Sequence, residues 1–127
     1  MGYMRHHAII VTVSYADIEE ARNKAIEIFN KPAEGDVGIL HGAPDIISNV
    51  VSDNINGHSS FFIAPDGSKE GWPESELGNE RRAEFVQWLN DQSYGDGSNR
   101  FAWVEVQYGD EDGHQKVLNG SRFLSEE

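Results

Sequence analysis

A short turn signal, Asn56-Gly57, stands between two stretches of strand-forming residues, 46–55 and 59–64. Asn-Gly is the strongest short signal for a β-hairpin, because a type I′ turn needs a positive φ at both central residues. Earlier in the chain, residues 7–13 form a β-branched, continuously apolar run that is typical of a central strand buried on both faces. We therefore predict a sheet that contains a hairpin and a buried central strand.

Two amphipathic helices are predicted, one before the hairpin and one after it. Residues 16–29 carry apolar side chains at helical spacing, with Ser14 as the expected N-cap. The second helix is expected to begin at Pro73 or Asn79 and to end at Asn90. The side chains predicted to form its buried stripe are Leu77, Phe85, Trp88 and Leu89.

The last third of the chain predicts two further strands. Residues 100–108 alternate, and residues 114–118 are predicted to form the last strand after a turn at residues 109–113. The expected fold is α+β, a ferredoxin-like split βαβ (β-α-β-β-α-β plus a C-terminal strand), with two helices on one face of an antiparallel sheet. We expect residues 1–127 to form a single domain with frayed ends at 1–5 and 120–127. In the alternating strand we assign these residues to the core face: Ala102, Val104, Val106 and Tyr108.

Composition excludes several classes of function. The 127 residues include no cysteine, so disulfides, thiolate nucleophiles and thiolate zinc sites are excluded. The net charge of −12 repels a nucleic-acid backbone, and no segment approaches the ~20 apolar residues that span a bilayer. We therefore expect a cytoplasmic protein with no direct nucleic-acid partner and no membrane partner.

One bend combines basic groups with a large aromatic side chain. Ser68 and Lys69 follow a Pro-Asp-Gly turn, Trp72 comes next, and Arg81 and Arg82 lie early in the second helix. A loop N–H group, a helix N-terminus and paired arginines are typical of an anion site, with the indole available to stack on a base. The alternative interpretation is a solvated turn, with both arginines paired to nearby glutamates along the helix.

A second candidate surface is predicted on the alternating strand. With the core face assigned as above, Phe101 and Trp103 stand on the open face of the sheet. Exposed aromatics of this kind bury area in a homodimer or lie under a loop, here residues 30–44. The chain lacks the aromatic motif of RNA-recognition sheets, so base stacking is not expected there.

No catalytic, metal or cofactor site is predicted. The five histidines follow no zinc-binding spacing, and the acidic turn at residues 110–113 is only a fragment of a calcium loop. Ser59, Ser60 and Ser68 lack a nucleophile-elbow context. Carboxylates near the bend could form an acid–base pair, so enzyme activity stays open although we favour its absence.

Four segments carry a resemblance to a protein family. RHHAIIVT, SFFIAPDGSKEGW, NERRAEFVQWL and WVEVQYGD resemble segments of uncharacterised small acidic proteins of tailed phages and prophages. The resemblance covers most of the chain and implies an accessory protein that acts inside a bacterial host as an antagonist of host defence.

Two mechanisms then compete. In the first, the bend residues bind and sequester a small anionic nucleotide-type ligand, with a homodimer as one arrangement of the site. In the second, the acidic surface mimics nucleic acid and occupies a basic channel on a host defence nuclease or DNA-binding complex. We favour sequestration, because a mimic needs neither Trp72 nor adjacent arginines. An enzyme acting on a phosphate-containing ligand is a further alternative.

Overall fold

The computed structural model describes residues 5–31, 46–53, 55–65, 67, 72–96, 98–109 and 115–121. In chain order the elements are β1 (His6–Ser14), α1 (Ile18–Phe29), β2 (Val51–Ser52), β3 (His58–Ile63), α2 (Pro73–Asn90), β4 (Ala102–Tyr108) and β5 (Lys116–Gly120).

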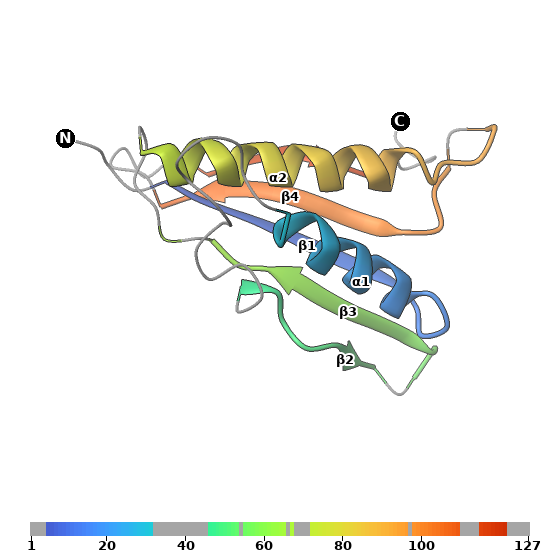
Figure 1. The fold of residues 1–127 in the computed structure, drawn as a ribbon. Coiled ribbons are helices and arrows are strands. Elements are labelled where there is room, and N and C mark those ends of the chain that lie inside the picture. The colour runs from blue at the N-terminus through green and yellow to red at the C-terminus, as the bar shows by residue number, and fades with distance from the viewer. Residues whose placement is uncertain are drawn as a thin grey trace.

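The strands form a five-stranded antiparallel sheet in the order β2-β3-β1-β4-β5. β1 lies at the centre, paired with β3 on one side and β4 on the other. Both helices lie on the same side of the sheet (Figure 1), with α1 packed on β1, β3 and α2, and with α2 on the β4 side. The predicted α+β class with an antiparallel sheet and two helices is confirmed.

A hydrophobic core fills the space between the helices and the sheet. Phe85 stacks on Trp88 with ring centroids 6.0 Å apart, and Trp88 contacts Phe101 at 5.5 Å. The predicted stripe of α2 is confirmed, since Leu77, Phe85 and Leu89 are buried and Trp88 is partly buried. The sheet contributes Ile9, Val11, Val13, Phe61, Ile63 and Trp103 to the same cluster.

β4 turns the opposite face to the helices from the one predicted. Phe101 is 0% exposed and Trp103 is 4% exposed, so the prediction that they stand on an open, interface-forming face is wrong. The alternation of the sequence allows either face inward, and burying two large aromatics removes more apolar area from water than burying the smaller aliphatic residues between them. This choice also buries Glu105, whose Oε1 accepts a 2.9 Å hydrogen bond from Asn119 Nδ2.

The predicted central strand is central but is covered on one face only. Ile9 and Val11 are fully buried against the helices, whereas Ile10 between them is 45% exposed. The helices cover one face of the sheet, so the continuous apolar run of β1 supplies both a core face and an apolar outer face.

The boundaries of the first helix and of the hairpin differ in detail from the predictions. α1 begins at Ile18 after Asp17, and Ser14 ends β1 instead of capping the helix; the carbonyl of Ser14 accepts a 2.9 Å hydrogen bond from the Asp17 N–H. The predicted hairpin is confirmed, although β2 is only two residues long and the connection to β3 is longer than a two-residue turn.

Gly57 gives the hairpin its backbone geometry. Its φ is +75°, a conformation in which any Cβ is strained, and its carbonyl accepts a 2.8 Å hydrogen bond from the Tyr15 N–H. We expect Gly57→Ala to lower the free energy of unfolding by about 1–2 kcal/mol. Gly95→Ala is the matched control, because Gly95 does not have such a φ and no described atom lies within 4 Å of the added Cβ.

The control should change stability by no more than about 0.5 kcal/mol in urea unfolding. Equal effects of the two substitutions would contradict this role for Gly57.

Neither helix, in the part of the chain that the structure describes, is long and apolar enough to cross a membrane.

Candidate ligand-binding site

Of the five residues predicted to bind a ligand, the structure describes three, Trp72, Arg81 and Arg82. Ser68 and Lys69 lie outside the described residues. Trp72 is the N-cap of α2 and is partly exposed. Arg81 and Arg82 are 8% and 3% exposed, so they are not on a solvated face of the helix. Being adjacent in a helix, they point in directions about 100° apart.

Arg81 contacts the end of the first helix. Its Nη2 donates a 3.2 Å hydrogen bond to the carbonyl of Lys31, and its Nη1 lies 3.9 Å from Glu84 Oε1. Lys31 Nζ also pairs with the Glu84 carboxylate. Arg81 therefore joins the C-terminal end of α1 to α2.

Arg82 lies in the wall of a different feature, a cavity of about 540 Å³ between α2 and the strands β1, β4 and β5. Its Nη2 donates a 2.5 Å hydrogen bond to Asn79 Oδ1. We call this cavity the α2–β5 pocket, and its lining residues are Arg5, His7, Asn79, Arg82, Ala83, Val86, Gln87, Asn90, Glu105, Leu118 and Asn119.

The helix wall of the pocket follows from the periodicity of α2. The residues of α2 that line the pocket recur at spacings of three and four residues, which places them on one stripe of the helix. They are Asn79, Arg82, Ala83, Val86, Gln87 and Asn90. On the neighbouring stripe Phe85 and Leu89 enter the core. The polar stripe thus meets the sheet beside the core, where Glu105 is turned inward by the burial of the aromatic residues before it.

The lining is rich in groups that recognise a small polar anion. Arg5 and Arg82 against Glu105 give a formal charge of +1 with His7 neutral, inside a chain of net charge −12. Four amide side chains add paired hydrogen-bond donors and acceptors. They are Asn79, Gln87, Asn90 and Asn119.

Sequence reasoning identified Arg82 but missed the strand side of this pocket. The sequence places Arg5 in the frayed N-terminal end and His7 at the start of the first strand, and it assigns Glu105 to the opposite face of β4. The signal that could have found Glu105 is its position two residues after Trp103, since residues at i and i+2 of a strand share a face. Burial of the aromatic residue therefore implies burial of the carboxylate.

A second cavity, of about 470 Å³, lies at the other end of the sheet. Its arginine, Arg100, is held by Asp17 at 3.3 Å and by Glu20 at 3.0 Å, and stacks on the Phe101 ring at 4.4 Å. Two carboxylates on one guanidinium leave little attraction for an anionic ligand.

Asp53, which lines that cavity, has a lowered pKa in the folded protein. We therefore predict that the protein loses stability in acid. The Ile55 N–H donates a 3.0 Å hydrogen bond to its carboxylate, and together with the N–H groups of Asn56 and His58 it lowers the pKa of Asp53 below the usual 3.8. A lowered pKa in the folded state stabilises the protein above the unfolded pKa, and this contribution disappears as the pH falls through the folded pKa.

We expect Asp53→Asn, which keeps the acceptor oxygen but removes the charge, to lower the urea midpoint at pH 7. The difference from wild type should close at pH values below the pKa of folded Asp53, where wild-type Asp53 is protonated. A difference that is the same at all pH values would show that the charge is irrelevant.

The described residues contain no group of three or more His, Asp or Glu side chains able to hold a metal ion. His41 and His114 lie outside the described residues. Comparison of the chain with protein-family models, with curated proteins and with solved structures gives no match.

Proposed function

We propose that this protein binds and sequesters a small anionic ligand of nucleotide type in the α2–β5 pocket, without turning it over. The observation that carries the proposal is the position of Arg82, which is almost fully buried and still lines an open cavity together with Arg5. Burying a guanidinium is costly unless it is hydrogen-bonded, and at binding sites such a group provides charge-assisted hydrogen bonds to phosphate or carboxylate.

The size and chemistry of the pocket support this ligand class. A volume of about 540 Å³ is in the usual range for small-molecule sites, roughly 300–1,000 Å³. Arginine binds a phosphate through two parallel hydrogen bonds, whereas amide side chains such as Asn119 match the donors and acceptors at a base edge. The apolar lining residues Val86 and Leu118 provide a surface for the flat part of the ligand.

The biological setting is part of the proposal. The resemblance to small acidic phage proteins suggests that the ligand is a nucleotide signal of host defence, and that the protein acts in the host cytoplasm by lowering its free concentration. Sequestration requires tight binding and a stable site but no catalytic group.

We also infer that β1 to β4 with both helices form a ferredoxin-like unit extended at its edge by β5. The sheet order β2-β3-β1-β4 and the antiparallel pairing of β1 with both neighbours support this. In such a unit the pocket lies where the added strand meets the second helix.

A second candidate function is mimicry of nucleic acid. The outer faces of both helices carry exposed carboxylates, which would attract a basic channel on a host nuclease or DNA-binding protein. The exposed acidic residues of and next to the helices are Glu19, Glu20, Glu27, Glu76, Glu80 and Asp91. This candidate predicts a protein partner that is released by salt, since exposed charges are screened within about 8 Å at physiological ionic strength.

A third candidate is an enzyme acting on a phosphate-containing ligand in the same pocket. Glu105 is buried there, and His7 lies on the same face of the sheet one pair away, because Ile9 pairs with Glu105 and His7 with Gln107. A carboxylate and an imidazole so placed could transfer protons. Mass spectrometry of the recovered ligand separates this candidate from sequestration, which predicts unchanged ligand.

Thermal unfolding with a panel of linear and cyclic nucleotides tests the main proposal. A ligand present at 100 times its Kd stabilises the folded state by about 2.7 kcal/mol, which raises Tm by several degrees. We expect at least one nucleotide to do so. No shift with any of them would contradict nucleotide binding, and release of a host protein by salt would then favour mimicry.

A further inference from the structure

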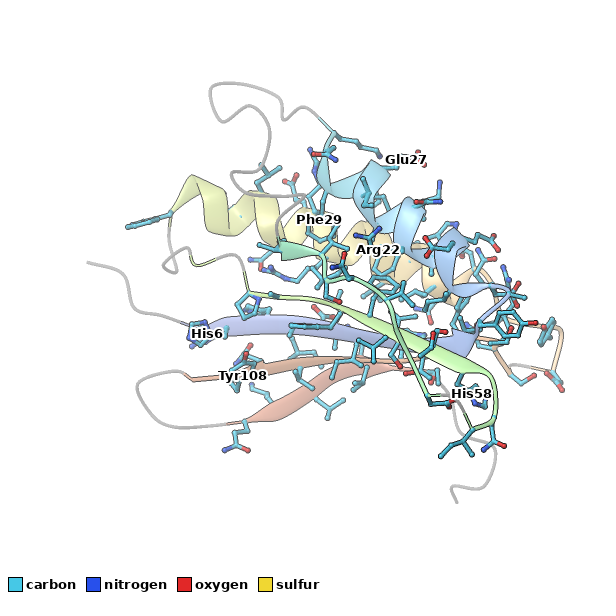
Figure 2. All side chains as sticks on the ribbon, turned by 90° about the horizontal axis from the view of Figure 1, so that it is seen from below. His6, Arg22, Glu27, Phe29, His58 and Tyr108 are labelled. Carbon is cyan, nitrogen blue, oxygen red and sulfur yellow. The ribbon has the colours of Figure 1, made fainter. Side chains whose placement is uncertain are left out.

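The face of the sheet opposite the helices is apolar over its middle strands. Phe62, Ile10 and Val104 lie directly across β3, β1 and β4, since Ile10 pairs with both of the others. The next row pairs Ala8 with Val106. We call these side chains, together with Tyr108, the outer apolar face. Figure 2 shows Tyr108 beside His6 at one end of the sheet, with His58 at the other end.

This face exposes large side chains around a hollow. Ile10 is 45% exposed and Phe62 is 44% exposed. With Val106, Tyr108 and the small residue Ala8 they line a depression of about 620 Å³. Contiguous apolar surface of this size on a protein marks an interaction site.

The absence of charged side chains on this face allows a partner that is also acidic to approach it. Along the described residues of β1, β3 and β4, no Asp, Glu, Lys or Arg side chain lies on this face of the sheet, although the chain has 22 acidic residues. A basic partner or a nucleic acid would gain no charge pairing here. Two copies of the chain, each of net charge −12, can approach each other by this face. The exposed helix carboxylates of each copy then lie on the side of its sheet that faces away from the other copy, so the two sets are on the order of 30–40 Å apart. That separation is several times the ~8 Å screening length.

The size of the face suits a symmetric contact. With strands about 4.8 Å apart and a rise of about 3.4 Å per residue, the five strands together present roughly 470 Å² in projection. The accessible area of such a side-chain-covered surface exceeds its projection, so it is comparable with the ~800 Å² that each partner buries in a standard interface.

We propose that the outer apolar face binds a second copy of this chain, so that two sheets stack face to face about 10 Å apart. A large apolar side chain of one copy then enters the depression beside Ala8 in the other. The contact is separate from the α2–β5 pocket, which lies on the helix side, so it stands whether or not the proposed ligand is found.

Sedimentation equilibrium and light scattering test this proposal. We expect the wild type to have twice the 14.2 kDa mass of one chain. Phe62→Asp puts a charge at the centre of the contact and should give a folded monomer. Tyr94→Asp is the matched control, because Tyr94 is equally aromatic and exposed but lies in the loop after α2, and it should stay dimeric.

A wild type with the mass of one chain at every concentration would overturn the proposal. That result would mean that another part of the chain, or a different protein, covers the face. A dimer that survives both Phe62→Asp and Val106→Lys would equally overturn it, because the contact would then lie elsewhere. Val106→Lys also provides the test if Phe62→Asp fails to fold.

Discussion

Replacing Arg82 with methionine should weaken ligand binding by about 10- to 150-fold. A charge-assisted hydrogen bond contributes about 1.5–3 kcal/mol, and this free energy converts to that range of Kd. Methionine keeps the aliphatic stem that packs in the wall of the α2–β5 pocket and removes only the guanidinium. Isothermal titration with the nucleotide that raises Tm most measures the change.

Arg81→Met is the matched control for this substitution. Arg81 is adjacent in sequence and also buried, but its hydrogen bond to the Lys31 carbonyl holds α1 rather than lining the pocket. We expect it to lower stability while leaving Kd within about twofold. If both substitutions weaken binding equally, loss of fold rather than loss of a contact explains the effect, and Arg82 has no direct role.

Replacing Phe101 with alanine should destabilise the protein by about 3–5 kcal/mol, a large part of the total stability of a domain of this size. Phe101 is fully buried between Trp88 and the Arg100 guanidinium, so its removal leaves a cavity that these neighbours cannot fill. The urea midpoint and the unfolding enthalpy both report the loss.

Ala102→Thr tests the same face assignment from the other side. Ala102 is exposed on the outer side of β4, next to Thr12 of β1. A β-branched polar residue fits such a position, so the change should be within about 0.5 kcal/mol. A large cost here together with a small cost for Phe101→Ala would mean that β4 faces the other way.

The fold could be predicted to the extent that it depends on periodicity and turn chemistry. The Asn56-Gly57 signal found the hairpin, and the spacing of Leu77, Phe85 and Leu89 found α2 and its buried stripe. These patterns are local, so they hold whatever the chain packs against.

The face of β4 could not be predicted because its alternating sequence is apolar on both sides. Which side is buried depends on the total area removed from water across the whole sheet, where Trp103 outweighs the valines. The same limit applied to β1, whose second apolar side is exposed because the helices cover a single face of the sheet.

The candidate site could be predicted only in part for a related reason. Arg82 was identified from its charge, but its separation from Arg81 follows from the helix position relative to the sheet. Glu105 and Asn119 meet only through the pairing of β4 with β5, a contact between segments with no shared motif. A pocket built from such pairings leaves no continuous signature in the chain.

Side-chain amide resonances offer the most direct measurement of the central claim. In a ¹⁵N-labelled sample titrated with the nucleotide panel, sequestration in the α2–β5 pocket predicts saturable shifts of the NH₂ groups of Asn79 and Asn119, with the same Kd for both. The backbone amides around His58 and Asp53 should not move. Saturable shifts confined to the cavity that Asp53 and His58 line, or no shifts with any nucleotide, would contradict binding in the α2–β5 pocket.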